Sequence, residues 1–262
     1  MPLKEGSKNV KVMAVLVPVL SIVAIIADWS MMPEFKVWEI CGYSYTTTLV
    51  HLHVVLWYCT CCSVAACGRH LVHLLYQGTQ NGRHVSNYCS LWQDLSRLSR
   101  KIGESFCYIY GLIIIIWFST MTLSLYGGLT GILDHGCGLR EFGLIVNATF
   151  CTFILFLICD AGEKLSDELG PKFLENLRSL NVVVNRDVKQ ELDVFRYDVA
   201  MTAPVINLGG YVSLNRNLLL NLMATMVSQM IILLQFRIGA KPDNVPQTVV
   251  FNETCKLICK EQ

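Results

Sequence analysis

Residues 217–236 read NLLLNLMATMVSQMIILLQF, twenty residues without a charged side chain. At about 1.5 Å of rise per residue, a helix of this length crosses a bilayer core of about 30 Å. Six positions recur at spacings of 4, 3, 4, 3 and 4 and share one face, and five of the six are polar or small: Asn217, Asn221, Ala224, Ser228, Ile231 and Gln235. Because amides without partners are costly in lipid, this face needs protein or water against it. Two interpretations stay open here: packing against other helices, for which such residues are typical, or the lining of a water-filled pore.

The whole chain has the composition of a polytopic membrane protein. Of its 262 residues, 53% are hydrophobic and 16% are charged, its mean hydropathy is +0.46, and soluble domains carry about 25% charged residues. Five spans are predicted, at residues 12–27, 40–68, 105–133, 142–159 and 217–236. No Walker loop, zinc signature or nucleophile elbow is present, so we expect no catalytic residue, no metal site and no cofactor. We expect the chain to contact membrane lipid and not to bind nucleic acid.

The distribution of positive charge predicts the orientation. With the N-terminus inside, the segments on the cytoplasmic side hold fifteen of the 21 Lys and Arg residues, which favours a cytoplasmic N-terminus and an extracellular C-terminus. Asn252 begins a glycosylation sequon in the polar tail and is expected to be glycosylated there, whereas the sequon at Asn147 lies inside a span. Four cysteines could form one or two disulfides of open connectivity, three of them outside the spans and Cys41 at the edge of the second: Cys41, Cys137, Cys255 and Cys259.

This orientation divides the chain into five parts. They are a cytoplasmic N-terminus (1–11), a four-helix transmembrane region (12–160) with a cytoplasmic loop (69–104), a cytoplasmic helical anchor segment (161–216), the last span (217–236) and an extracellular tail (237–262). The anchor segment contains two predicted helices, and the second carries an apolar stripe: Val188, Leu192, Phe195 and Val199. Such stripes bury against each other, against the membrane or against another copy of the chain, and we favour the last as an assembly face.

Among His, Asp, Glu, Lys and Arg residues, only His51 and His53 lie within a predicted span. Being two residues apart, they point to different faces of a helix and cannot jointly bind a metal. One interpretation is that each is hydrogen-bonded within the bundle. The other is a pocket that opens to the outside, lined by amphipathic side chains of neighbouring spans: Trp117, Thr120, Ser124 and Asn147.

Residues 224–236, ATMVSQMIILLQF, resemble the C-terminal signature of insect gustatory receptors, which is Thr-Tyr, five hydrophobic residues and Gln-Phe. Residues 230–234 match the five hydrophobic positions, and Gln235 and Phe236 match the end. Ser228 and Gln229 replace Thr-Tyr. Residues 206–217 are also similar to the approach to this helix in the carbon dioxide receptor branch.

The resemblance implies an all-α polytopic membrane fold with seven spans, of which this chain holds five, so that two N-terminal spans are missing. It implies a subunit of a tetrameric ligand-gated cation channel in the plasma membrane, homomeric or heteromeric, gated by a small-molecule tastant or carbon dioxide. The last helix would then line the pore through Asn217, Asn221, Ser228, Ile231 and Gln235, with Ile231 as a hydrophobic gate. The candidate ligand pocket is His51, His53, Trp117, Thr120 and Asn147.

Two rival classes make different predictions. A fragment of a G-protein-coupled receptor predicts an outside N-terminus, against the charge bias, and no polar face on the last helix. A secondary transporter predicts internal repeats and ionisable or broken helices near the bilayer midplane, and the sequence shows neither.

Overall fold

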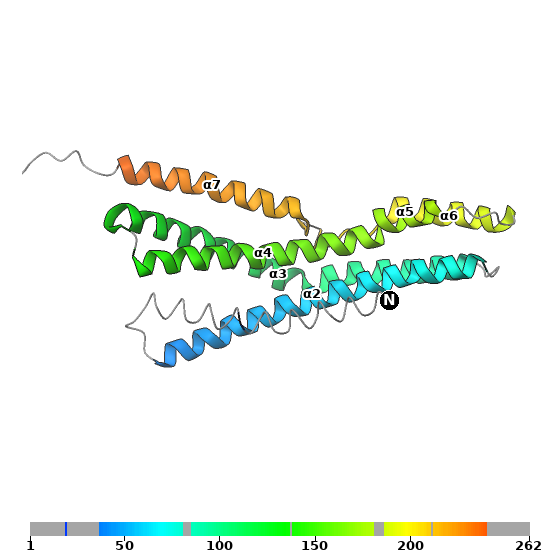
Figure 1. Ribbon diagram of the computed structural model, residues 1–262, viewed down its shortest axis with the longest axis horizontal. Coiled ribbons are helices and arrows are strands. Elements are labelled where there is room, and N and C mark those ends of the chain that lie inside the picture. The colour runs from blue at the N-terminus through cyan, green and yellow to red at the C-terminus, as the bar shows by residue number, and fades with distance from the viewer. Residues whose placement is uncertain are drawn as a thin grey trace, which may run out of the picture. The chain divides into compact units, whose positions relative to one another are not determined.

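A computed structural model of the protein describes Val19 and residues 37–80, 85–136, 138–180, 186–210 and 212–239. These residues form six helices of two or more turns and a two-stranded hairpin (Figure 1): α2 (Val37–Gln80), α3 (Val85–His135), α4 (Leu139–Leu169), α5 (Pro171–Ser179), α6 (Arg186–Thr202), β1 (Asn207–Leu208), β2 (Val212–Ser213) and α7 (Arg216–Gly239). The chain up to Leu222 and the chain from Met223 onward are two compact units, which we describe separately.

The predicted all-α membrane architecture is confirmed. Within the described residues, four helical segments are long and apolar enough to cross a membrane: Ser44–Gly78, Val85–Asp134, Leu139–Ser179 and Arg216–Arg237. Each contains most or all of one predicted span. The other predicted span, residues 12–27, lies outside the described residues.

The helices run further than the sequence predicts. The sequence predicts a cytoplasmic loop over residues 69–104 and a span that begins at residue 105, yet residues 85–135 form the single 51-residue helix α3. Gly127 and Gly128 of this helix admit α4, because a Cβ at Gly127 would lie 3.3 Å from Leu144 and one at Gly128 would lie 3.4 Å from Ile145. Their role here is close helix packing rather than helix termination.

Helices α2, α3 and α4 pack against one another around buried aromatic side chains. Trp57 of α2 is fully buried, its indole N–H donates to the carbonyl oxygen of Ile158 at 3.2 Å, and its ring lies 4.7 Å from that of Tyr110. The Tyr110 hydroxyl donates to the carbonyl oxygen of His53 at 2.6 Å. Polar atoms of the aromatic core are thereby satisfied in a region where water is excluded.

A second core lies where α5 and α6 meet the ends of α2 and α3, which contact one another there. It contains ten buried residues: Leu71, Leu75, Val85, Trp92, Phe173, Leu177, Leu180, Leu192, Phe195 and Val199. The rings of Trp92, Phe173 and Phe195 lie 5.7 to 6.1 Å apart, and the Trp92 indole donates to the carbonyl oxygen of Leu169 at 3.1 Å. Three of the four residues of the predicted stripe on α6 are therefore buried within one chain. The prediction that this stripe forms an assembly face is wrong, because the predicted helices pack on each other and on α3.

The hairpin between α6 and α7 lies against α3 and α4. Its strands pair with Asn207 opposite Ser213, and the turn uses Gly209 and Gly210, whose φ angles of 58° and 80° favour glycine. A Cβ at Gly103 of α3 would lie 2.9 Å from the carbonyl oxygen of Asn207. The hairpin backbone can approach α3 because that position has no side chain.

We predict that Leu192→Ala, which empties part of the second core, lowers the free energy of unfolding by about 2–5 kcal/mol. The matched control is Leu91→Ala, because Leu91 is 52% exposed, and it should change that free energy by less than about 0.5 kcal/mol. Denaturant or thermal unfolding of the detergent-solubilised protein measures both. Equal effects of the two variants would contradict the buried position of Leu192.

Candidate functional site

The polar stripe of α7 consists of Asn217, Asn221, Ala224, Ser228, Ile231 and Gln235, and all six side chains are exposed in the single chain. The Ser228 hydroxyl donates to the carbonyl oxygen of Ala224 at 3.0 Å, within the helix. Leu233 is also 37% exposed, so exposure in one chain does not separate the stripe from the rest of α7. What distinguishes it is chemistry: amide and hydroxyl groups recur along this face, although Thr225 and Gln229 place further polar groups elsewhere on the helix. Its role as a pore lining stays a prediction.

The start of α7 is fixed by several polar contacts. The Asn215 side-chain oxygen accepts the backbone N–H of Leu218 at 2.9 Å, as an N-cap does. The Glu163 carboxylate of α4 accepts the backbone N–H of Arg216 at 2.6 Å. A carboxylate at this position also stabilises the positive end of the helix dipole.

A charged cluster at the same place was not found by sequence analysis. The Asp160 side chain is 6% exposed, and its carboxylate accepts the guanidinium of Arg216 at 2.8 Å and the ammonium of Lys164 at 2.6 Å. Arg216 also lies 3.5 Å from the Glu163 carboxylate. The available signal was positional: Asp160 directly follows one predicted span and Arg216 directly precedes the last, so both charges lie at the same membrane boundary.

Two of the five predicted pocket residues come together with a third aromatic side chain. His51 of α2 is 1% exposed, its ring lies 5.7 Å from that of Trp117 and 5.1 Å from that of Phe150, and the last two rings are 5.9 Å apart. We call these three residues the aromatic cluster. Phe150 was missed, although it follows Asn147 by three residues and so shares its helix face.

The other predicted pocket residues lie in different surroundings. His53 is half-buried and its Nδ1 lies 2.8 Å from the carbonyl oxygen of Leu49, on another face of α2. The Asn147 amide donates to the Ser124 hydroxyl at 3.1 Å, which joins α4 to α3. Thr120 is half-buried on α3. Ligand binding by these residues stays a prediction.

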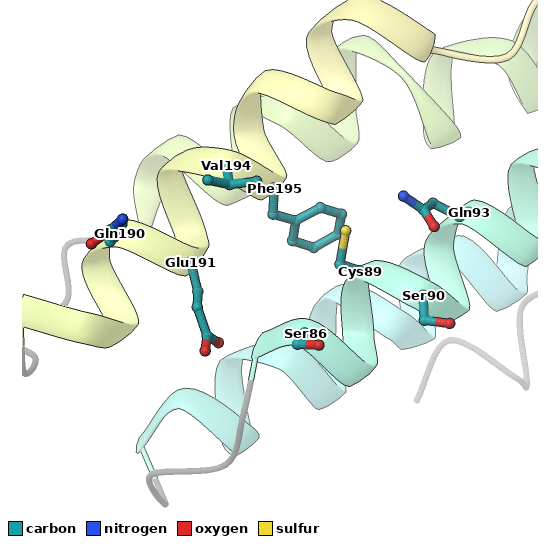
Figure 2. Close-up of a pocket in the computed structure, with 8 residues that line it drawn as sticks. All are labelled: Ser86, Cys89, Ser90, Gln93, Gln190, Glu191, Val194 and Phe195. Atoms are coloured by element: carbon teal, nitrogen blue, oxygen red, sulfur yellow. The ribbon is translucent and has the colours of Figure 1, made fainter.

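A groove of about 590 Å³ lies between α3 and α6 (Figure 2) and is lined by Ser86, Cys89, Ser90, Gln93, Gln190, Glu191, Val194 and Phe195. Figure 2 shows the Cys89 sulfur and the Phe195 ring pointing toward one another across it. The Gln93 amide donates to the Asp198 carboxylate at 2.8 Å, and Glu191 accepts a hydrogen bond from the backbone N–H of Val85 at 3.1 Å. A second groove of about 500 Å³ adjoins it along α6 and is lined by Lys189, Gln190, Asp193, Val194 and Tyr197.

In the part of the chain that the structure describes, no group of three His, Cys, Asp or Glu side chains could hold a metal ion. Cys41 lies exposed on α2. The remaining predicted disulfide partners and the predicted glycosylation site lie outside the described residues: Cys137, Cys255, Cys259 and Asn252.

Comparison with known proteins gives a consistent result. Residues 7–239 match the family described as 7tm Chemosensory receptor. The chain is 32% identical to "Gustatory and odorant receptor 24" of Anopheles gambiae, with 87% of this chain and 51% of that protein covered. It is 27% identical to "Gustatory and odorant receptor 21a" of Drosophila melanogaster, with 84% and 49% covered. The chain thus spans about half the length of these relatives.

The same fold occurs in a solved structure. The insect olfactory receptor OR5 from Machilis hrabei matches with a TM-score of 0.73 at 12% identity, over 90% of this chain and 68% of that one. At this identity the match shows the fold alone.

Proposed function

Because the chain belongs to the 7tm chemosensory receptor family, among the insect gustatory receptors, we propose that it is a subunit of a ligand-gated cation channel of a sensory membrane. The observation that carries this proposal is the polar stripe of α7. A helix apolar enough to cross the membrane exposes two asparagines, a serine and a glutamine on one face. Water inside an assembled pore would hydrate this polar face, whereas lipid offers it no hydrogen-bonding groups.

We propose that Asn217, Asn221, Ser228, Ile231 and Gln235 line this pore and that Ile231 is its gate. A narrow ring of isoleucine side chains excludes water when closed, which stops ion flow without a charged barrier.

Cysteine substitution along α7 tests the pore. Aqueous thiol reagents should modify Ser228→Cys and Gln235→Cys rapidly in membranes. The matched controls Leu233→Cys and Leu234→Cys should be modified slowly, because thiols in lipid ionise poorly. Ile231→Ala should conduct without ligand in cells under voltage clamp, because a smaller apolar constriction wets more easily. Equal reactivity around the helix would return α7 to a packing role.

The aromatic cluster is the proposed centre of the ligand pocket. It combines the imidazole of His51 with the aromatic rings of Trp117 and Phe150, and the Asn147–Ser124 pair lies on the same two helices as Phe150 and Trp117. The proposed ligand is a small-molecule tastant or carbon dioxide, and the similarity of residues 206–217 to the carbon dioxide receptor branch favours the latter.

Phe150→Ala should raise the carbon dioxide concentration needed for half-maximal current, since it removes one wall of the cluster, while Ser228→Cys in the same background keeps its thiol reactivity. Phe153→Ala is the matched control, because Phe153 lies one turn away and is 37% exposed. An unchanged concentration dependence in Phe150→Ala would exclude the cluster as the pocket.

We propose a cytoplasmic N-terminus and an extracellular C-terminus in the plasma membrane, on the charge bias described above. Glycosylation of Asn252 marks this orientation, and a glycosidase-sensitive mobility that Asn252→Gln abolishes would support it.

Assembly into a homomeric or heteromeric tetramer is the last part of the proposal. The face of α6 opposite the second core carries exposed apolar side chains at spacings of three and four, namely Val194, Tyr197 and Met201, with 63%, 65% and 67% exposed. Val194 lines both grooves described above. We propose that this exposed stripe packs against neighbouring subunits.

Changing both Tyr197 and Met201 to Asp should dissociate oligomers on native gels, because burying two carboxylates without partners costs several kcal/mol by order of magnitude. Ala200→Asp is the control, since Ala200 is exposed on the same helix but lies off the stripe. Oligomers of unchanged size in the double variant would rule out this surface.

A further inference from the structure

We propose that the ion pair between Asp160 and Arg216 fixes the rotation of α7 about its own axis and so decides which residues face the pore. This inference rests on the proposed channel function. It assigns Arg216 a positioning role, since its side chain contacts α4 and not the proposed ion path.

Two independent attachments hold the first residue of α7. The backbone N–H of Arg216 donates to the Glu163 carboxylate at 2.6 Å, which sets where the helix begins. The guanidinium donates to Asp160 through Nη2 at 2.8 Å and Nε at 3.3 Å, which sets the direction in which that residue points. A helix held at both its backbone and its first side chain cannot turn about its axis without breaking one of them.

The chain just before α7 leaves little room for adjustment. A Cβ added to Gly162, between the two carboxylates on α4, would lie 2.8 Å from the carbonyl oxygen of Leu214. The backbone of the hairpin thus touches α4 two residues before Arg216. One turn of α4 therefore positions the whole entry to α7.

Helix geometry connects this contact to the polar stripe. Successive residues are rotated by about 100°, so Asn217, Ser228 and Gln235 all lie about 100° to 120° from Arg216 in one sense, and Leu233 lies about 100° from it in the other. The first two turns agree with this reading: Asn217 and Asn221 are exposed, whereas Leu218, Leu219 and Leu222 are half-buried. A rotation of half a turn would exchange the polar stripe for leucine.

Lys164 provides a control that separates positioning from charge. Its ammonium also donates to Asp160, at 2.6 Å, but it belongs to α4 itself at i+4. Replacing Lys164 removes one cation from Asp160 but keeps the ion pair between Asp160 and α7. Replacing Arg216 removes that ion pair, so that α7 can rotate.

The test is the rate of modification of Ser228→Cys and Leu233→Cys by an aqueous thiol reagent, in membranes from cells that express the whole chain. Peptide mass spectrometry at the introduced cysteine distinguishes it from the twelve native cysteines. With Arg216 intact, Ser228→Cys should react much faster. Arg216→Ala should abolish the difference in rate between the two positions, Lys164→Ala should retain it, and Arg216→Lys should restore most of it because the charge is kept.

Monodisperse elution in detergent identifies folded variants, and Arg216→Gln replaces Arg216→Ala if the latter fails this check. A difference in rate that persists in both neutral variants would overturn the positioning role while leaving the pore intact. Equal rates with Arg216 present would overturn the proposed pore itself.

Discussion

Within hydrocarbon, every backbone N–H and C=O group must be hydrogen-bonded inside the protein, and this requirement makes α4 the element on which its neighbours depend. Long helices satisfy their own backbones, so few polar atoms remain to join one helix to another. Two of the joining bonds end on α4: Trp57 of α2 donates to the Ile158 carbonyl, and Trp92 of α3 donates to the Leu169 carbonyl. Between these two carbonyls, one turn of α4 also supplies the two carboxylates, of Asp160 and Glu163, that hold Arg216.

Helix type and membrane character were predictable because they follow from local composition. Four predicted spans lie within described helices. Helix ends were less predictable, since glycine pairs serve both turns and close packing, and only the presence of Leu144 and Ile145 decides between them. The stripe of Leu192 and Phe195 was recognised as needing burial, but its partner Trp92 is about a hundred residues away along the chain.

Contacts between distant residues account for what the sequence analysis missed in the candidate site. His51, Trp117 and Phe150 come from three helices, and Asp160 pairs with a residue 56 positions later. Helical periodicity separates His51 from His53, as expected, but it cannot say that Tyr110 donates to the backbone of His53. The polar stripe of α7 could be predicted in full because it needs nothing beyond one helix.

The two opposite faces of helix α6 have different partners: one is buried within the chain, and the other is proposed to pack against another chain. Leu192, Phe195 and Val199 form one face, which the second core covers completely. Tyr197 and Met201 form the other, and they would be unusual on a surface that only water contacts. A helix that is apolar on two faces needs a partner on each, and the described chain supplies one. The same reasoning applies to α7, where lipid suits the leucine face and only water or protein suits the polar stripe. The exposed stripe of α6 and the polar stripe of α7 therefore both need a partner, which another subunit would supply. In our proposal, the contact at Arg216 sets the direction in which the polar stripe of α7 faces.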